Sequence, residues 1–115
     1  MKYLFLLYPS GLPEPGTAEA RQLLSEWTTA REAMADAGVL IDCAPLQPVT
    51  ASTTVRVRDG ETLLTDGPAA EIKEYFGGFT LIECGDLDEA LKWASSLPNA
   101  RIGSVEVRPV IQVER

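Results

Sequence analysis

The chain of 115 residues contains no histidine, and this absence removes several kinds of chemistry at once. A Ser–His–Asp triad, a histidine zinc site and an imidazole general base are all excluded. Only two cysteines are present, Cys43 and Cys84, and a cysteine zinc site would need more ligands. We interpret both thiols as small buried side chains, with a disulfide or a catalytic thiol as the alternative. No metal or cofactor is expected.

Long apolar runs are also missing. The segment 3–8 is strongly apolar, but it has six residues and is closed by Pro9. It is therefore too short for the apolar region of a signal peptide, which needs about 7–15 residues. Nothing approaches the roughly 18 apolar residues that cross a membrane. We expect a cytoplasmic protein with no membrane partner.

Basic residues are scarce, with 10 Lys and Arg against 17 Asp and Glu and a formal net charge of −7. Binding to a phosphate backbone needs a basic surface, so nucleic acid is not an expected partner. Apolar residues make up 45% of the chain and charged residues 23%, which is typical of a soluble globular protein. The length predicts one domain over residues 1–115.

Hydrophobic periodicity and turn signals predict a regular order of elements. Asp59-Gly60 is the strongest hairpin signal. Thr17 and Asp86 are the expected N-caps of two helices, and Pro98 is the expected end of the second helix. The expected strands cover 2–8, 39–44, 53–58, 61–65, 79–84 and 104–110, and the expected helices cover 18–37 and 87–97, with a short helical segment after Pro68. This order predicts a ferredoxin-like βαββαβ fold of the α+β class with an inserted hairpin and both helices on one face of the sheet.

Each helix is expected to bury an apolar stripe. The stripes consist of Ala20, Leu23, Leu24, Trp27, Ala30, Met34 and Ala37 in the first helix, and of Leu87, Ala90, Leu91, Ala94 and Leu97 in the second.

The first strand is apolar on both faces, with Tyr3, Phe5 and Leu7 on one side and Leu4, Leu6 and Tyr8 on the other. Two helices can cover only one face of a sheet, so the other face needs a second cover. A second copy of the same sheet would provide it, because symmetric homodimers are the commonest oligomers. A long loop lying over the open face is the alternative.

Several short motifs occur together in the second half of the chain. They are Asp66-Gly67-Pro68, Glu71-x-Lys73-Glu74, Gly77-Gly78-Phe79, Asp88-Glu89-Ala90 and Glu106-Val107-Arg108-Pro109-Val110. Together with the opening MKYLFLLY and the segment 53–56, they make the chain resemble the YCII-related, or DGPF, family over essentially its whole length. The resemblance implies a bacterial cytoplasmic protein of largely uncharacterised function. It also implies a ferredoxin-like domain whose sheets pair in a dimeric α/β barrel.

The chain departs from this family at two points. Ala69 stands where the family carries a phenylalanine after Asp-Gly-Pro, so the packing of that ring is altered or replaced. The histidine of other YCII branches, which is thought to support enzymatic work with an aspartate, has no counterpart. Both departures argue against the chemistry proposed for the family.

Asp66 is the candidate catalytic residue, because a carboxylate at a turn, near Glu71 and Lys73 in sequence, could act as a general base or bind a polar ligand. The structural alternative is that Asp66 satisfies backbone amides at the turn. The candidate ligand-binding residues are Tyr8, Arg56, Arg58, Lys73 and Arg108. Guanidinium groups on strands can receive a carboxylate or a phosphate, or they can pair with glutamates such as Glu83 and Glu106.

Two functions remain open. The first is a ligand-binding, accessory or regulatory homodimer that takes a small anionic or aromatic ligand. The second is a cofactor-independent lyase or isomerase acting on a small polar or aromatic compound, with Asp66 as base and an arginine as anion anchor. A roomy pocket between subunits lined by Asp66, Tyr8 and an arginine would favour the enzyme, and a filled interface would favour the binding module.

Overall fold

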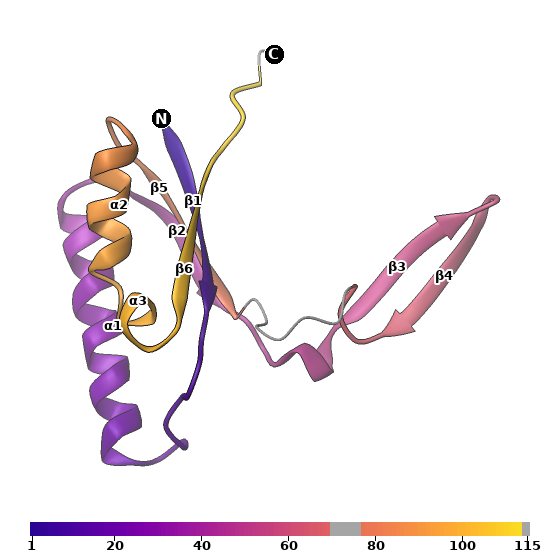
Figure 1. The fold of residues 1–115 in the computed structure, drawn as a ribbon, viewed down its shortest axis with the longest axis horizontal. Coiled ribbons are helices and arrows are strands. Elements are labelled where there is room, and N and C mark those ends of the chain that lie inside the picture. Colours follow the sequence, from indigo (N-terminus) through magenta and orange to yellow (C-terminus); the bar gives the residue numbers. More distant parts are fainter. Residues whose placement is uncertain (70–76, 114–115) are drawn as a thin grey trace.

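The computed structural model describes residues 1–69 and 77–113 and places a four-stranded antiparallel sheet against a layer of helices (Figure 1). The sheet has the order β2–β5–β1–β6, so each helical connection joins two strands that are not neighbours. The strands are β1 (Lys2–Tyr8), β2 (Leu40–Pro45), β5 (Gly78–Glu83) and β6 (Ser104–Pro109), and the helices are α1 (Ala18–Asp36), α2 (Leu87–Ser95) and α3 (Pro98–Ile102). The predicted ferredoxin-like α+β fold is confirmed.

The core lies between the helices and one face of this sheet. Alternate residues of β1 point into it, and Phe5 at its centre is fully buried. Ile82 of β5 and Met34 of α1 are likewise fully buried, so the sheet and the helix layer are in contact with no solvent between them at these residues. The buried apolar residues are Tyr3, Phe5, Leu7, Ala30, Met34, Val39, Ile82, Cys84, Ala90, Ala94 and Leu97.

Both predicted N-caps are confirmed. The Thr17 hydroxyl accepts a hydrogen bond from the Ala20 amide at 3.2 Å, and the Asp86 carboxylate accepts one from the Glu89 amide at 2.9 Å. The Glu89 carboxylate in turn accepts a hydrogen bond from the Gly85 amide at 2.8 Å. These two bonds satisfy the Glu89 amide, which has no helical partner in the first turn of α2, and the Gly85 amide just before the cap.

The second helix differs from the prediction at its end. It stops at Ser95, and Pro98 begins the separate short helix α3 instead of terminating the preceding one. Proline suits a first helical position because its missing N–H would have no partner there. The buried face of α2 is also narrower than predicted, since Ala90 and Ala94 are buried while Leu87 and Leu91 are 46% and 47% exposed.

In α1 the predicted stripe is only partly buried. Ala30 and Met34 are buried and Trp27 packs against the core, but Leu24 is 68% exposed and Ala37 is an exposed capping residue. The first half of α1 extends beyond the strands that it was expected to cover. Its apolar side chains border a cavity there, as described below.

The predicted hairpin forms a second, separate sheet of β3 (Thr53–Arg58) and β4 (Glu61–Asp66), which follows the 3₁₀ turn η1 (Val49–Ala51). Positive φ angles of 51° at Asp59 and 77° at Gly60 give the two-residue turn a geometry that matches the twist of paired strands. The hairpin projects away from the helices, on the opposite side of the four-stranded sheet (Figure 1). The radius of gyration of 16.4 Å reflects this shape, since a compact chain of this length would have roughly 13 Å.

Two further sequence predictions concern the segment after Pro68 and the absence of a membrane-spanning segment. The short helical segment after Pro68 falls largely on residues 70–76, which lie outside the described residues. In the ranges that the structure describes, no helix combines the length and the apolar character needed to cross a membrane.

Candidate functional site

The face of the sheet opposite the helices is apolar along β1 and β5, as the sequence predicted, and the ion-paired Glu106 and Arg108 of β6 lie beside it. Leu4 and Leu6 of β1 are half-buried there, beside Leu81 and Phe79 of β5, with which they pair in register. Tyr8 continues the same row next to Ser104 of β6. No helix lies over this face in Figure 1. We call these side chains, Leu4, Leu6, Tyr8, Phe79 and Leu81, the open face.

A cavity of about 780 Å³ lies where the N-terminal half of α1 passes the ends of β1, β2 and β5. Gly77 joins its walls, because its amide donates to the Leu7 carbonyl at 2.8 Å and its carbonyl accepts from the Leu46 amide at 2.9 Å. A Cβ at Gly77 would lie 2.7 Å from Pro9 Cδ, so glycine permits this close approach. The apolar lining is Leu7, Pro9, Leu12, Ala20, Leu23, Leu24, Trp27, Ala44, Pro45, Leu46, Pro48, Val49 and Phe79.

Few polar side chains line this cavity. Arg31 is an exposed residue of α1, and in the parts of the chain that the structure describes no carboxylate pairs with its guanidinium. Asn99 of α3 is 6% exposed, and its Oδ1 accepts no hydrogen bond from the residues that the structure describes. The remaining polar members of the lining are Thr28, Cys43 and Gln47. Apolar walls with a few polar groups are typical of sites for small organic molecules.

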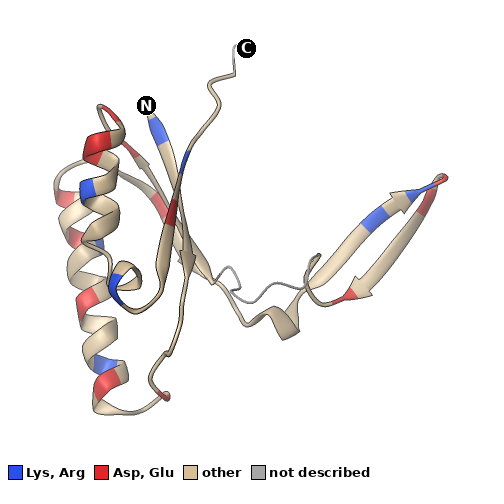
Figure 2. Cartoon of the chain, in the orientation of Figure 1, with Lys and Arg blue, Asp and Glu red and all other residues tan. Residues whose placement is uncertain are grey.

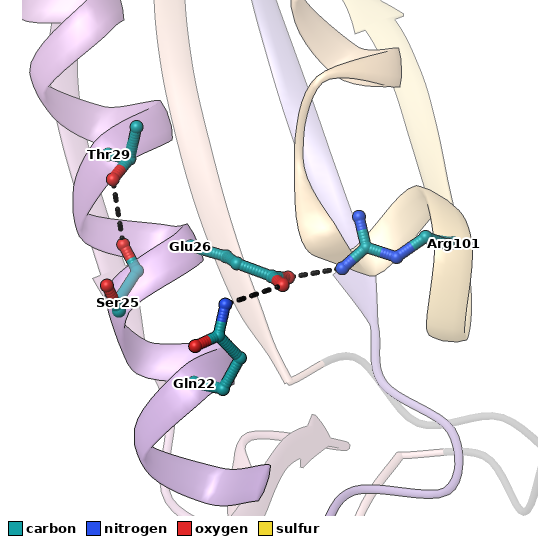
Figure 3. Close-up of polar contacts among 5 residues, drawn as sticks. All are labelled: Gln22, Ser25, Glu26, Thr29 and Arg101. Atoms are coloured by element: carbon teal, nitrogen blue, oxygen red, sulfur yellow. Dashed lines mark hydrogen bonds and ion pairs between the residues drawn. The ribbon is translucent and has the colours of Figure 1, made fainter.

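Arg101 shows by contrast how another arginine close to α1 is engaged. Its guanidinium forms an ion pair with Glu26, which also accepts a hydrogen bond from Gln22 Nε2 at 3.4 Å (Figure 3). The ion pair joins α3 to α1. Both partners are solvent-accessible, so it fixes geometry more than it adds stability.

Asp66 is the last residue of β4, opposite Thr53 in the hairpin register. It is exposed, and its carboxylate accepts no hydrogen bond from any described residue. The turn that follows is stabilised by other groups, since the Thr54 hydroxyl donates to the Gly67 carbonyl and the Gly67 amide donates to the Ser52 carbonyl. Asp66 is not part of the cavity lining.

The three candidate arginines do not converge on one site. Arg56 and Arg58 lie on the hairpin (Figure 2), where they donate to the carbonyls of Ala69 and Val57. Arg108 lies on β6 and forms an ion pair with Glu106 of the same strand. Tyr8 lies on the open face, and Lys73 is outside the described residues. Among the described residues, therefore, none of the predicted ligand-binding side chains lines the cavity.

The two cysteines are free and differ in environment. Cys84 is buried, and burial raises the pKa of its thiol, with Glu89 adding to the shift. Burial likewise raises the pKa of the neighbouring Tyr3 phenol, with smaller contributions from Cys84 and Asp86. A thiol held protonated is a poor nucleophile, so Cys84 is a packing residue, as the sequence indicated. Cys43 is half-buried and borders the cavity.

Arg31 and Asn99 were not singled out from the sequence. One signal was present, since Arg31 follows Trp27 by four residues on the apolar side of α1, where a charge is unusual. Asn99 offered no such signal, because its place in the cavity wall depends on α3, which the sequence pattern did not predict.

The architecture is thus a small ferredoxin-like α+β domain with an added hairpin and an apolar cavity beside its first helix. The chain belongs to the YCII-related family, whose domain model matches residues 1–114. An uncharacterised protein of Rhizobium meliloti (strain 1021) is 44% identical over 94 residues, which span 80% of this chain and 76% of that protein.

Among solved structures, the fold is similar to that of the 5-chloro-2-hydroxyhydroquinone dehydrochlorinase TftG from Burkholderia phenoliruptrix AC1100, in complex with 2,5-dihydroxybenzoquinone. The match has a TM-score of 0.53 and covers 98% of this chain and 96% of that one. Sequence identity is 14%, so this likeness concerns the fold.

Proposed function

We propose that this chain is a homodimeric module that binds a small organic acid with an apolar, aromatic body. The observation that carries this proposal is the cavity of about 780 Å³ with its apolar walls and the guanidinium of Arg31, with which no carboxylate of residues 1–69 and 77–113 pairs. A volume of this size is within the range that accommodates small ligands. Trp27 and the leucines of α1 would contact the apolar body of the ligand.

Arg31 determines the charge of the expected ligand. A guanidinium donates two parallel hydrogen bonds to a carboxylate, which is stronger and more directional than a contact with a neutral group. Glu26 of α1 is already paired with Arg101, and no carboxylate of the described residues pairs with Arg31. A bound carboxylate would therefore give Arg31 a partner that the described part of the chain does not supply.

Homodimer formation is supported by the open face. Leu4, Leu6 and Leu81 form a contiguous apolar row on a sheet that has helices on its other face only. Contiguous apolar surfaces on small proteins mark interaction sites, and a second copy of the same sheet has the matching shape and chemistry. The sheet pairing of a dimeric α/β barrel would bury this row.

The second candidate function is a cofactor-independent lyase or isomerase that uses Asp66 as base. It is supported by the likeness in fold to a dehydrochlorinase that holds a hydroxylated quinone. Asp66 lies outside the cavity of its own subunit, so this function requires a second subunit to bring Asp66 to the ligand. The binding module needs no such step, and we place it first.

The ligand proposal predicts that Arg31→Gln weakens binding of an aromatic carboxylate at least about tenfold, because a hydrogen bond to a charged group contributes about 1.5–3 kcal/mol. Binding is measured by calorimetry and thermal shift with a panel of benzoates, hydroxybenzoates and their uncharged amides. Acids should stabilise the wild type more at each higher concentration, following the logarithm of one plus concentration over the dissociation constant, and the amides should do so less.

The matched control is Arg21→Gln, which removes the other arginine of α1. Arg21 donates to the Gly16 carbonyl and does not line the cavity. Equal losses of affinity in the two variants, or no stabilisation by any acid of the panel, would show that Arg31 is not an anion anchor.

The dimer proposal predicts that light scattering gives about twice 12.5 kDa at micromolar concentration and that Leu6→Lys yields a folded monomer. A lysine at the centre of the open face would bury a charge in the interface, which is costly. Leu91→Lys on α2 places the same charge at an exposed site in the helical layer and should leave the dimer intact. A wild type that is monomeric at every concentration rules the dimer out.

A further inference from the structure

One face of the hairpin carries an exposed apolar strip. Val55 and Leu64 are direct cross-strand partners, and Val57 follows Val55 by two residues, so the three side chains share a face. They are 60%, 68% and 60% exposed for Val55, Leu64 and Val57 respectively. We call these three residues the hairpin strip.

The described part of the chain does not cover this strip. β3 and β4 pack on each other, and no other described helix or strand contacts them to a comparable extent. A lone two-stranded hairpin is marginally stable in water, and β-branched and leucine side chains gain stability on a sheet only when something packs on them. The hairpin therefore needs a partner surface.

The position of the hairpin indicates which surface this is. The hairpin and the open face lie on the same side of the molecule, since both are opposite the helices (Figure 1). A second copy laid on the open face would lie alongside the hairpin. Under two-fold symmetry the hairpin of the second copy would reach the first in the same way. One association would thus bury both apolar surfaces.

Charge is consistent with the same partner. Arg56 and Arg58 on the other face of the hairpin have no carboxylate partner within the described residues, where their guanidinium groups donate to backbone carbonyls. The chain carries 17 acidic against 10 basic residues, so a second copy presents an excess of carboxylates. Asp59, Glu61 and Asp66 accompany the two arginines, so the hairpin is not basic as a whole, and the attraction is limited to ion pairs that Arg56 or Arg58 forms with single carboxylates of the second copy.

We propose that the β3–β4 hairpin is a dimerisation arm whose strip, Val55, Val57 and Leu64, packs against a second copy of this chain. This inference rests on the proposed homodimer and adds to it a second contact that the sheets alone do not provide. Asp66 shares the face of the strip, so the arm would also carry Asp66 to the partner.

The test compares Leu64→Lys with Thr65→Lys by sedimentation across a concentration series. Leu64 belongs to the strip, whereas Thr65 is the next residue and points to the opposite face of the same strand. Since each substitution occurs twice in a symmetric interface, Leu64→Lys should raise the dimer dissociation constant at least about hundredfold, and Thr65→Lys should leave it within about threefold.

Hydrogen exchange provides a second readout that does not depend on the variants of the strip. In the wild-type dimer the cross-strand amides of β3 and β4 should be protected, and in the Leu6→Lys monomer they should exchange at least about tenfold faster while the amides of β1 and β5 remain protected. This pattern would show that the partner, and not the hairpin alone, stabilises the arm.

The possible failures are distinguishable. A wild type that is monomeric throughout overturns the homodimer and the arm together. A dimer that dissociates with Leu6→Lys but tolerates Leu64→Lys, or that is weakened equally by Leu64→Lys and Thr65→Lys, overturns the arm and leaves the sheet-paired dimer. Hairpin amides that stay protected in the monomer also overturn the arm.

Discussion

Phe5→Ala should lower the free energy of unfolding by about 3–5 kcal/mol, the range for truncating a fully buried phenylalanine. Phe5 is 0% exposed, and it sits on a central strand between β5 and β6, where it pairs with Thr80 and Val107. Neighbours on both sides are held by backbone ladders, so they cannot collapse into the space. The loss would be a large part of the 5–15 kcal/mol that stabilises a typical domain.

The measurement is urea denaturation followed by circular dichroism, with Leu91→Ala as control. Leu91 is 47% exposed on α2, and its truncation should change stability by less than about 1 kcal/mol. If both variants lose similar stability, the core does not centre on β1. A reduced urea midpoint with an unchanged slope would show that Phe5 acts on the folded state.

The position of Phe5 in the core could be predicted because strand alternation is a local property. Alternation put Phe5 on one side of the strand at 2–8 together with Tyr3 and Leu7, and the structure buries all three. The caps Thr17 and Asp86 were equally predictable, since a capping side chain bonds an amide three residues away. Local chemistry therefore determined most elements and their order.

Features that depend on distant neighbours could not be predicted. Leu24 and Leu87 fit their helical stripes by spacing, yet both are exposed, because burial depends on how far the sheet extends beneath each helix. The Asp59-Gly60 turn specified that β3 and β4 pair, but it carried no information about what packs on them. The hairpin was predicted as an insertion, and the structure shows that it forms a two-stranded sheet of its own.

The candidate site also combines features that local sequence predicts with features that depend on residues far apart in the chain. The sequence analysis chose arginines on strands as ligand-binding residues because charges on helices usually face solvent. The arginine that lines the cavity, Arg31, is instead on the helix α1. The cavity itself forms only when the loop after β2 and Gly77 meet α1, residues far apart in sequence. Asp66 was chosen because it begins the Asp66-Gly67-Pro68 motif. In the structure it lies at the end of β4 on the hairpin, where a catalytic role would require a second subunit.

Gly103→Ala should destabilise the protein by about 3 kcal/mol, at the upper end of the cost of overpacking a fixed site. A Cβ at Gly103 would lie 2.0 Å from the carbonyl oxygen of Tyr8 and 3.1 Å from the amide nitrogen of Ser10. Both are backbone atoms, so no side-chain rotation can relieve the contact. Either β1 must move away from β6 at the pair Tyr8–Ser104, or α3 must shift.

Gly85→Ala is the matched control. Its Cβ would approach only the Glu89 carboxylate, at 3.3 Å, which is the end of a flexible side chain. We expect this variant to lose less than about 1 kcal/mol, measured by the same urea denaturation. Equal losses in the two variants would contradict the close approach of α3 and β6 to the end of β1.

Gly103→Ala should also weaken binding of an aromatic acid in the fraction that remains folded. The Gly103 amide donates to the Asn99 carbonyl at 2.8 Å, and Asn99 and Pro9 both line the cavity. If the end of β1 moves away from Gly103, Pro9 moves with it. If α3 moves instead, Asn99 moves with it. Calorimetry at a temperature where the variant is folded separates this loss from unfolding, and unchanged affinity would show that the cavity tolerates movement at this junction.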